Sequence, residues 1–225
     1  MNEGLASQTI KAIDTYTINE VGIPSLVLME RAALAITEEL LRSESGSAAS
    51  FAVICGTGNN GGDGLAIGRI LHQAGKTVDI YLVGNVEKAS DECRKQLRIA
   101  KNLGLSIEFF DESTEAFHAD VVLDALFGIG LDRDVEEPHK TAIERINRSH
   151  GQIVAVDVPS GLSADTGGAL GTAVKADTTL TIGFMKKGFS TKEAKPYIGK
   201  LKVMAIGYPD SSLLKDIIKK EQAND

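Results

Sequence analysis

Residues 51–71 read FAVICGTGNNGGDGLAIGRIL, and this stretch decides the fold. The apolar run 51–55 is typical of a buried strand, and the segment from Gly64 onward has apolar residues at helical spacing. Between them lie five glycines in the nine residues from Gly56 to Gly64, which predicts a glycine turn joining a strand to a helix. This unit is typical of α/β folds with a parallel sheet.

The rest of the chain repeats the same alternation. Six further apolar runs predict strands at 78–83, 107–110, 120–127, 152–158, 178–183 and 201–206. Amphipathic segments at 64–75, 87–104 and 136–151 predict helices, and each ends near a glycine, as helices commonly do. We therefore predict one three-layer domain over residues 1–225, with helices on both faces of a mostly parallel sheet.

Two helices are expected ahead of the first strand, from Ser7 to about Val21 and from Ser25 to about Arg42. The second is apolar around most of its circumference, more than packing on one sheet face requires. We predict a homodimer formed through the N-terminal helices, because a twofold axis brings the same patch of each copy together. The alternative is a helix that the monomer itself covers. The predicted interface comprises Leu26, Val27, Leu28, Met29, Ala32, Ala33, Leu34 and Ile36.

Composition excludes several classes of protein. Hydrophobic residues make up 43% of the 225 residues, enough for a core, and the net charge of −7 argues against a nucleic-acid partner. The sequence lacks a signal-peptide pattern and any apolar stretch near the roughly 18 residues of a membrane helix, which predicts a cytoplasmic protein without membrane contact. Of the two cysteines, Cys55 is expected in the core and Cys93 on the surface, and the four histidines lack zinc-site spacing.

The glycine turn matches the dinucleotide-binding pattern G-x-G-x-x-G at residues 56–61, but its surroundings differ from that of an NAD site. NAD binding needs an acidic residue at the end of the second strand, and residues 82–85 there read LVGN. The turn also contains Asn59, Asn60 and Asp63, and a carboxylate at the entrance of a helix repels a pyrophosphate. We expect a different small-molecule ligand here, although Asp63 is also a common helix N-cap.

Polar residues also occur at the ends of two later predicted strands. Asp124 interrupts an apolar strand, Asp157 ends the next one, and Ser160 follows in a turn. In the common strand order 3-2-1-4-5, these strand ends lie beside the glycine turn. Asn60, Asp124 and Ser160 then offer oxygen ligands that suit a monovalent cation, and the alternative is a hydrogen-bond network joining three loops. A serine hydrolase is disfavoured, because no histidine follows His150 and the nucleophile elbow lacks its first glycine.

Five segments together closely resemble the NAD(P)H-hydrate epimerase family, also called the YjeF N-terminal domain family. They are GIPSLVLMERAA (22–33), GTGNNGGDGLAIGRIL (56–71), DALFGIGL (124–131), VAVDVPSGLSADTG (154–167) and TLTIGFMKKGF (179–189). The resemblance runs from about Ala6 to Pro209, and the motifs N-N-G-G-D-G and V-D-x-P-S-G are highly specific. The chain departs from the family pattern at Ala33, Met185 and Ala205, all outside these two motifs.

The resemblance implies a Rossmann-like fold and interconversion of the R and S forms of hydrated NADH or NADPH. It implies one potassium ion per subunit, bound by Asn60, Asp124 and Ser160. Many members continue into a second, dehydratase domain, whereas this chain extends only about 20 residues past its last predicted strand. We therefore expect an epimerase only, with a separate NAD(P)H-hydrate dehydratase as its functional partner. The implied substrate contacts are Asn59, Asn60, Gly61, Gly62, Asp63, Gly128, Ile129, Gly130, Leu131, Asp132, Arg133, Asp134 and Asp157.

Inversion at C6 of the hydrated ring requires a group that protonates the departing hydroxyl and takes a proton from water returning on the other face. We assign this catalytic role to Asp157, with Asp63 orienting the substrate and the role of Lys186 left open. Two other functions stay open: a non-catalytic binding module of the same fold, and an NAD(P)-dependent oxidoreductase. The intact polar set favours the enzyme over the module, and the missing ribose acid argues against the oxidoreductase.

Overall fold

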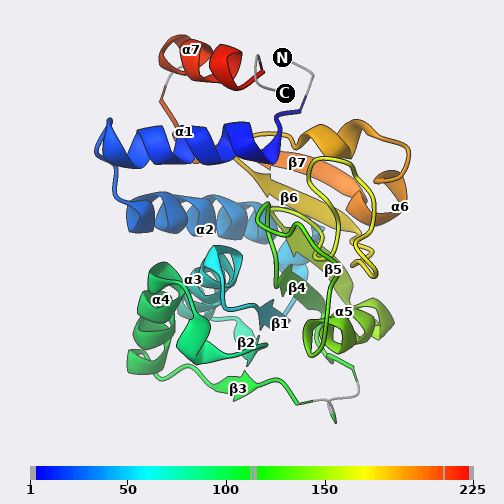
Figure 1. Cartoon of the computed structure of the whole chain (residues 1–225). Helices are drawn as coiled ribbons and strands as arrows, with labels where there is room; N and C mark the ends of the chain where they lie inside the picture. Colours follow the sequence, from blue (N-terminus) through cyan, green and yellow to red (C-terminus); the bar gives the residue numbers. More distant parts are fainter. Residues whose placement is uncertain (1–3, 112, 114–115, 210, 223–225) are drawn as a thin grey trace.

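The computed structural model of the protein describes residues 4–111, 113, 116–209 and 211–222. Seven strands form one parallel sheet in the order β3-β2-β1-β4-β5-β6-β7 (Figure 1). Both the predicted α/β fold and the predicted order of the first five strands are therefore confirmed. The strands are β1 (Ser50–Cys55), β2 (Thr77–Leu82), β3 (Ile107–Phe109), β4 (Val121–Ala125), β5 (Gln152–Val156), β6 (Thr178–Ile182) and β7 (Lys200–Met204).

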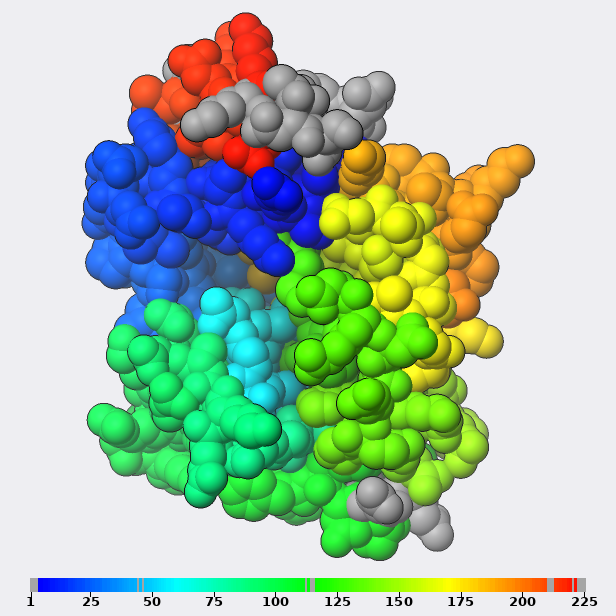
Figure 2. Space-filling model, viewed as in Figure 1, coloured from blue at the N-terminus to red at the C-terminus, as the bar shows by residue number. Residues whose placement is uncertain are grey.

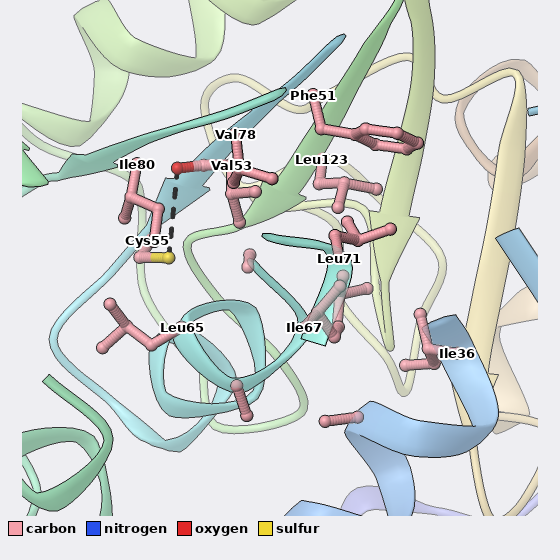
Figure 3. Packing of buried hydrophobic residues seen from close by; sticks show 14 of the residues in the cluster. Ile36, Phe51, Val53, Cys55, Leu65, Ile67, Leu71, Val78, Ile80 and Leu123 are labelled. Atoms are coloured by element: carbon pink, nitrogen blue, oxygen red, sulfur yellow. Dashed lines mark hydrogen bonds between the residues drawn. The ribbon is translucent and has the colours of Figure 1, made fainter. Parts of the chain in front are cut away.

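Helices cover both faces of this sheet, and the burial along β1 shows why. Successive strand residues point to opposite faces, so Phe51, Val53 and Cys55 join one apolar cluster while Ala52 and Ile54 join another. The first cluster contains α2 (Ser25–Arg42), α3 (Asn59–Gln73) and α4 (Asp91–Asn102), and the second contains α5 (His139–Arg148). Figure 3 shows the first cluster, in which side chains of α3 pack on the sheet.

The N-terminal helix lies outside these two layers. α1 (Ser7–Asn19) packs on α7 (Ser211–Gln222) above the β7 end of the sheet (Figure 1). The remaining helical segments are short: η1 (Glu44–Ser47), η2 (Val86–Lys88), η3 (Lys187–Ser190) and α6 (Lys195–Ile198). Within the described ranges, none of the helices combines the length and the apolar character needed to cross a lipid bilayer.

The glycine turn is shorter than the sequence predicts. α3 begins at Asn59, so the segment from Asn59 to Asp63 forms the first turns of the helix instead of a loop. Asp63 therefore lies inside the helix, and it is not the N-cap, which is Gly58. The glycines allow the helix to approach the residue that follows β1 closely, because a Cβ on Gly61 would lie 1.8 Å from the carbonyl oxygen of Gly56. This packing outweighs the low helix propensity of glycine.

Two other expectations need correction. Cys93, expected on the surface, is 1% exposed, and its thiol lies 3.8 Å from the carbonyl oxygen of Gly56 because α4 packs against α3. The sequence analysis also proposed no helix after the last strand, whereas α7 follows β7. Leu214 and Ile218 of α7 pack on Ile13 of α1, so the last helix covers the first one.

Most of the predicted dimer interface lies inside the monomer. Its buried members pack against α3, the sheet and the segment after β7, which corrects their assignment to an interface; they are Leu28, Met29, Ala32, Ala33 and Ile36. Leu26 is half-buried. The large apolar side chains of α2 that stay exposed lie seven residues apart, and they are Val27, Leu34 and Leu41.

Candidate active site

The carboxyl ends of β1, β4 and β5 lie side by side. β4 pairs with both neighbours, with Cys55 opposite Ala125 and Asp124 opposite Ala155. The chain leaves β1 toward β2 and leaves β4 toward β5, so the loops diverge between β1 and β4, where α/β sheets commonly bind ligands. Figure 2 shows a hollow where the N-terminal helices (blue), the start of α3 (cyan) and the chain after β4 (green) meet.

Asp124 and Ser160 are hydrogen-bonded to each other at this edge. The Ser160 hydroxyl donates to Oδ1 of Asp124 at 2.5 Å, and the Ser160 backbone N–H donates to Oδ2 at 2.7 Å. The hydroxyl also accepts from the backbone N–H of Phe127 at 2.9 Å. Burial raises the pKa of Asp124 from 3.8 to about 6, although the hydrogen bonds from Ser160 act in the opposite direction. The hydrogen-bond network considered in the sequence analysis is thus present between two of the three loops.

Asn60, the residue expected to join this pair, has a different environment. Both polar atoms of its side chain, Oδ1 and Nδ2, are buried and have no hydrogen-bond partner among the described residues. Buried amides without a partner are rare in proteins and call for an explanation such as a bound ion or ligand. The Asn60 amide oxygen, the Asp124 carboxylate and the Ser160 hydroxyl are also donor types that hard cations take. These residue types therefore fit a hard cation.

Asp157 is held by a buried lysine. Its Oδ1 lies 2.5 Å from Nζ of Lys186, a side chain that is 1% exposed, and accepts from the backbone N–H of Ile182 at 3.0 Å. Nζ of Lys186 also donates to the carbonyl oxygens of Ile182 and Phe184, at 2.9 and 3.1 Å. Among the described non-glycine residues, Asp157 alone has a positive φ, 69°, a conformation that costs about 1–3 kcal/mol and is frequent at functional sites.

Gly128 lies between Asp157 and Asn60. A Cβ on Gly128 would lie 3.1 Å from Oδ2 of Asp157 and 3.5 Å from Cβ of Asn60. The carboxylate oxygen that does not bond to Lys186 therefore faces Gly128, on the same side as the Asn60 amide. The loop after β4 thus brings together two residues that are distant in sequence.

The other predicted substrate contacts differ in their exposure. Gly61 and Gly62 are buried, and a Cβ on Gly62 would lie 2.7 Å from Cε of Met29, so their surroundings include protein packing. Ile129 and Leu131 are half-buried against apolar clusters. The exposed members are Asn59, Gly130, Asp132, Arg133 and Asp134. The structure thus places the first part of the 128–134 loop at the strand ends and its last three residues at the surface.

Asp63 is buried near other acidic groups. Its side chain has no hydrogen bond or ion pair in the described part of the chain, and the residue is 9% exposed. Burial raises the pKa of Asp63 well above 3.8, and the charges of Asp157 and Asp14 raise this pKa further. Asp63 therefore holds its proton more tightly than an ordinary carboxyl group does.

The sequence analysis missed two residues near this site, Asp14 of α1 and Tyr208 after β7. The Tyr208 hydroxyl donates to Oδ1 of Asp14. Burial raises the pKa of Asp14, and the hydrogen bond from Tyr208 lowers it. The charge of Asp157 raises this pKa further, and that of Lys186 lowers it. Neither residue belongs to a local motif, and only the packing of distant segments brings them to the site.

These acids do not form a metal centre of their own. Among the residues that the structure describes, no group of three or more histidine, cysteine, aspartate or glutamate side chains is arranged to hold a metal ion. Asp14 and Asp157 raise the pKa of Asp63 through their charges, and the ammonium group of Lys186 is the positive charge paired with Asp157.

Comparison with known proteins supplies the family context for this geometry. The family described as YjeF-related protein N-terminus matches residues 25–188. The chain is 43% identical over 199 residues to the NAD(P)H-hydrate epimerase of Limosilactobacillus fermentum, covering 88% of this chain and 94% of that protein. It is 41% identical over 203 residues to the NAD(P)H-hydrate epimerase of Oenococcus oeni, covering 90% and 96%. The crystal structure of yeast ynu0 has the same fold, with a TM-score of 0.73 at 21% identity over 91% of this chain and 88% of that one.

Proposed function

The chain belongs to the YjeF-related protein N-terminus family, and from this premise we propose that it is an NAD(P)H-hydrate epimerase. It interconverts the R and S forms of hydrated NADH and NADPH, as a single domain of this type. The observation that carries the proposal is the pairing across Gly128: a carboxylate oxygen of Asp157 left free by Lys186 faces the side of the partnerless Asn60 amide. A binding module without catalysis has no need of such groups, and no observation favours that alternative.

The reaction needs an acid and a base at one ring carbon. Asp63 holds its proton more tightly than an ordinary carboxyl group because it is buried beside other acidic groups, and Asp157 is paired with Lys186. We therefore propose Asp63 as the acid and Asp157 as the base. In our mechanism, Asp63 donates its proton to the hydroxyl on C6, the C6–O bond breaks, and the lone pair of the ring nitrogen forms a C=N bond as water leaves.

Return of water to the opposite face completes the inversion. The water oxygen bonds to C6, Asp157 takes the proton of that water, and the C=N electron pair returns to the ring nitrogen. In the opposite direction the two carboxyl groups exchange roles, so each direction leaves the proton on the other acid. Asp157 is thus the catalytic residue proposed from the sequence, and Asp63 gains a catalytic part in addition to orienting the substrate.

The glycine segment and the 128–134 loop are proposed to bind the rest of the substrate. Residues 59–63 begin α3, so the backbone N–H groups of this first turn lie at the helix N-terminus, where negatively charged groups bind well. Arg133 is exposed in the loop after β4 and is suited to contact phosphate. Ile129 and Leu131 anchor that loop to the protein.

Potassium is proposed to bind at Asn60, Asp124 and Ser160, one ion per subunit. When bound, it supplies positive charge that keeps Asp124 ionised and gives the Asn60 amide oxygen a partner. The chain's own contribution is to join the loops after β4 and β5 beside the substrate, through the Asp124–Ser160 bonds and the bond from Phe127 to Ser160. Holding the loops in this orientation increases the reaction rate, because reacting groups must be aligned before reaction.

The test is an Asp157→Asn variant assayed by chromatographic separation of the R and S hydrates. We expect interconversion to fall by at least about 100-fold, as general acid–base groups contribute. Asp177→Asn is the matched control, since Asp177 accepts a hydrogen bond at the opposite end of β5, from the backbone N–H of Ile153. Full activity in Asp157→Asn would refute the assignment, and an inactive wild-type protein with potassium present would refute the proposed function.

Three further proposals concern the setting of the enzyme. A homodimer through the exposed line of Val27, Leu34 and Leu41 is supported by their spacing of seven residues, which places them on one side of α2. A separate NAD(P)H-hydrate dehydratase is the proposed functional partner. The cytoplasm is the proposed location, because reduced nicotinamide nucleotides are small soluble metabolites.

A further inference from the structure

Tyr208 makes contacts in two directions. Its hydroxyl donates to Asp14 on α1, while its ring stacks on Phe184 with centroids 5.1 Å apart and an interplanar angle of 20°. The ring also lies against Gly183, where a Cβ would be 2.3 Å from Cε2 of Tyr208. Tyr208 therefore joins the first helix to the loop that follows β6.

That loop carries the lysine of the active site. The carbonyl oxygens of Ile182 and Phe184 accept hydrogen bonds from Nζ of Lys186, and the same nitrogen contacts Oδ1 of Asp157. A continuous series of contacts thus leads from Asp14 through Tyr208 and Phe184 to Lys186 and Asp157. A change in the position of the Tyr208 ring would move the carbonyl groups that orient the lysine.

Other contacts hold both ends of this series in place. Leu5, just before α1, accepts from the backbone N–H of Lys187 at 2.9 Å and donates to the carbonyl oxygen of Met185 at 2.8 Å. Ile13 is fully buried between α1 and α7, one residue before Asp14. Burial also raises the pKa of Tyr208, so its hydroxyl remains a protonated donor across the pH range of any assay.

We propose that Asp14 and Tyr208 are positioning residues of the epimerase, which hold the loop after β6 so that Lys186 keeps Asp157 in its reactive orientation. This inference rests on the proposed function. Neither residue needs to touch the substrate. A shift of about 1 Å at a reacting group can cost on the order of 100-fold in rate, so a hydrogen bond at this distance from the chemistry can matter.

The test separates position from general stability with conservative variants. Tyr208→Phe keeps the stacked ring and loses the hydroxyl, and we expect kcat to fall by at least about tenfold with KM within about twofold. Asp14→Asn keeps an acceptor oxygen and should retain at least about half of kcat, whereas Asp14→Leu should match Tyr208→Phe. The double variant Asp14→Leu/Tyr208→Phe should be no slower than either single one, because both remove the same hydrogen bond.

Tyr16→Phe is the matched control. Tyr16 packs on the same apolar cluster as Tyr208, and its hydroxyl has no hydrogen bond in the described part of the chain, so this variant should keep wild-type kinetics. Wild-type kcat in Tyr208→Phe, equal loss in Asp14→Asn and Asp14→Leu, or multiplied losses in the double variant would each overturn the inference. If the wild-type protein is active and Tyr208→Phe is equally active, only this inference fails, whereas an inactive wild type refutes the proposed function beneath it.

Discussion

Replacing Gly61 by alanine tests what the glycines at the start of α3 do. A Cβ at this position would lie 1.8 Å from the carbonyl oxygen of Gly56, and real Cβ contacts stay beyond about 3.0 Å, so the helix must move by about 1 Å or more. Both contacting groups belong to the backbone, which cannot rotate out of the way. Overpacking of this kind costs about 1–3 kcal/mol, and we expect the upper end. In a chain of this length, about 3 kcal/mol lowers the melting temperature by roughly 6–12 °C.

The same movement displaces Asn60 and Asp63, which belong to the helix that must shift. We therefore expect Gly61→Ala to slow hydrate interconversion by on the order of 100-fold under conditions where the protein remains folded. Gly58→Ala is the control, because no atom lies within 4 Å of a Cβ there and φ is −86°, which any residue adopts. Thermal unfolding and chromatography of the two hydrates are the measurements. Equal damage by the two substitutions, or a wild-type rate in Gly61→Ala, would refute packing as the reason for the glycine.

Other predictions concern charge and assembly. Because burial raises the folded-state pKa of Asp63 above 3.8, its contribution to stability is present below that pH and is lost as pH rises; Asp63→Asn should therefore melt higher than wild type at pH 8 while losing epimerase activity, and a lower melting temperature there would contradict this. Asp124 acts in the same direction: the free energy of unfolding falls as pH rises from about 4 to about 6, by about 3 kcal/mol for a pKa raised from 3.8 to about 6. Potassium should consequently raise the melting temperature by up to roughly 10 °C at pH 8 and hardly at pH 5, relative to tetramethylammonium, whereas equal shifts would count against a site at Asp124. Leu34→Glu should convert a dimer to a monomer in light scattering at micromolar concentration, and a monomeric wild type would remove the dimer proposal.

The centre of the sheet was predictable because β1, β4 and β5 are buried on both faces. A strand such as β1 then appears as an uninterrupted apolar run, and polar residues within or after such runs stand out. Asp124, Asp157 and Ser160 were found in this way, and the strand order placed them beside Asn60. The beginning of α3 was missed because glycine has the lowest helix propensity after proline, and the close packing of these glycines on Gly56, Met29 and Ala125 is visible only in the structure.

Asp14 and Tyr208 could not be found from local sequence. Asp14 lies in an ordinary amphipathic helix, where a polar residue normally faces water. Tyr208 follows the last strand, and its partner is 194 positions earlier in the chain. Prediction of this pair requires knowing that α7 holds α1 over the β7 end of the sheet. Lys186 presents the same difficulty, since a lysine is seldom fully buried and only the position of Asp157 explains it.

The long separation in sequence between Asp14 and Tyr208 also has a consequence for co-translational folding. At about 5–20 residues per second, the tyrosine is synthesised on the order of 10–40 s after its partner. During that interval α1 has already left the exit tunnel, while the helix that covers Ile10 and Ile13 does not yet exist. The nascent chain therefore exposes Ile10 and Ile13 of α1 until α7 has been synthesised, and the contacts that position Lys186 are complete only after Tyr208 has been added.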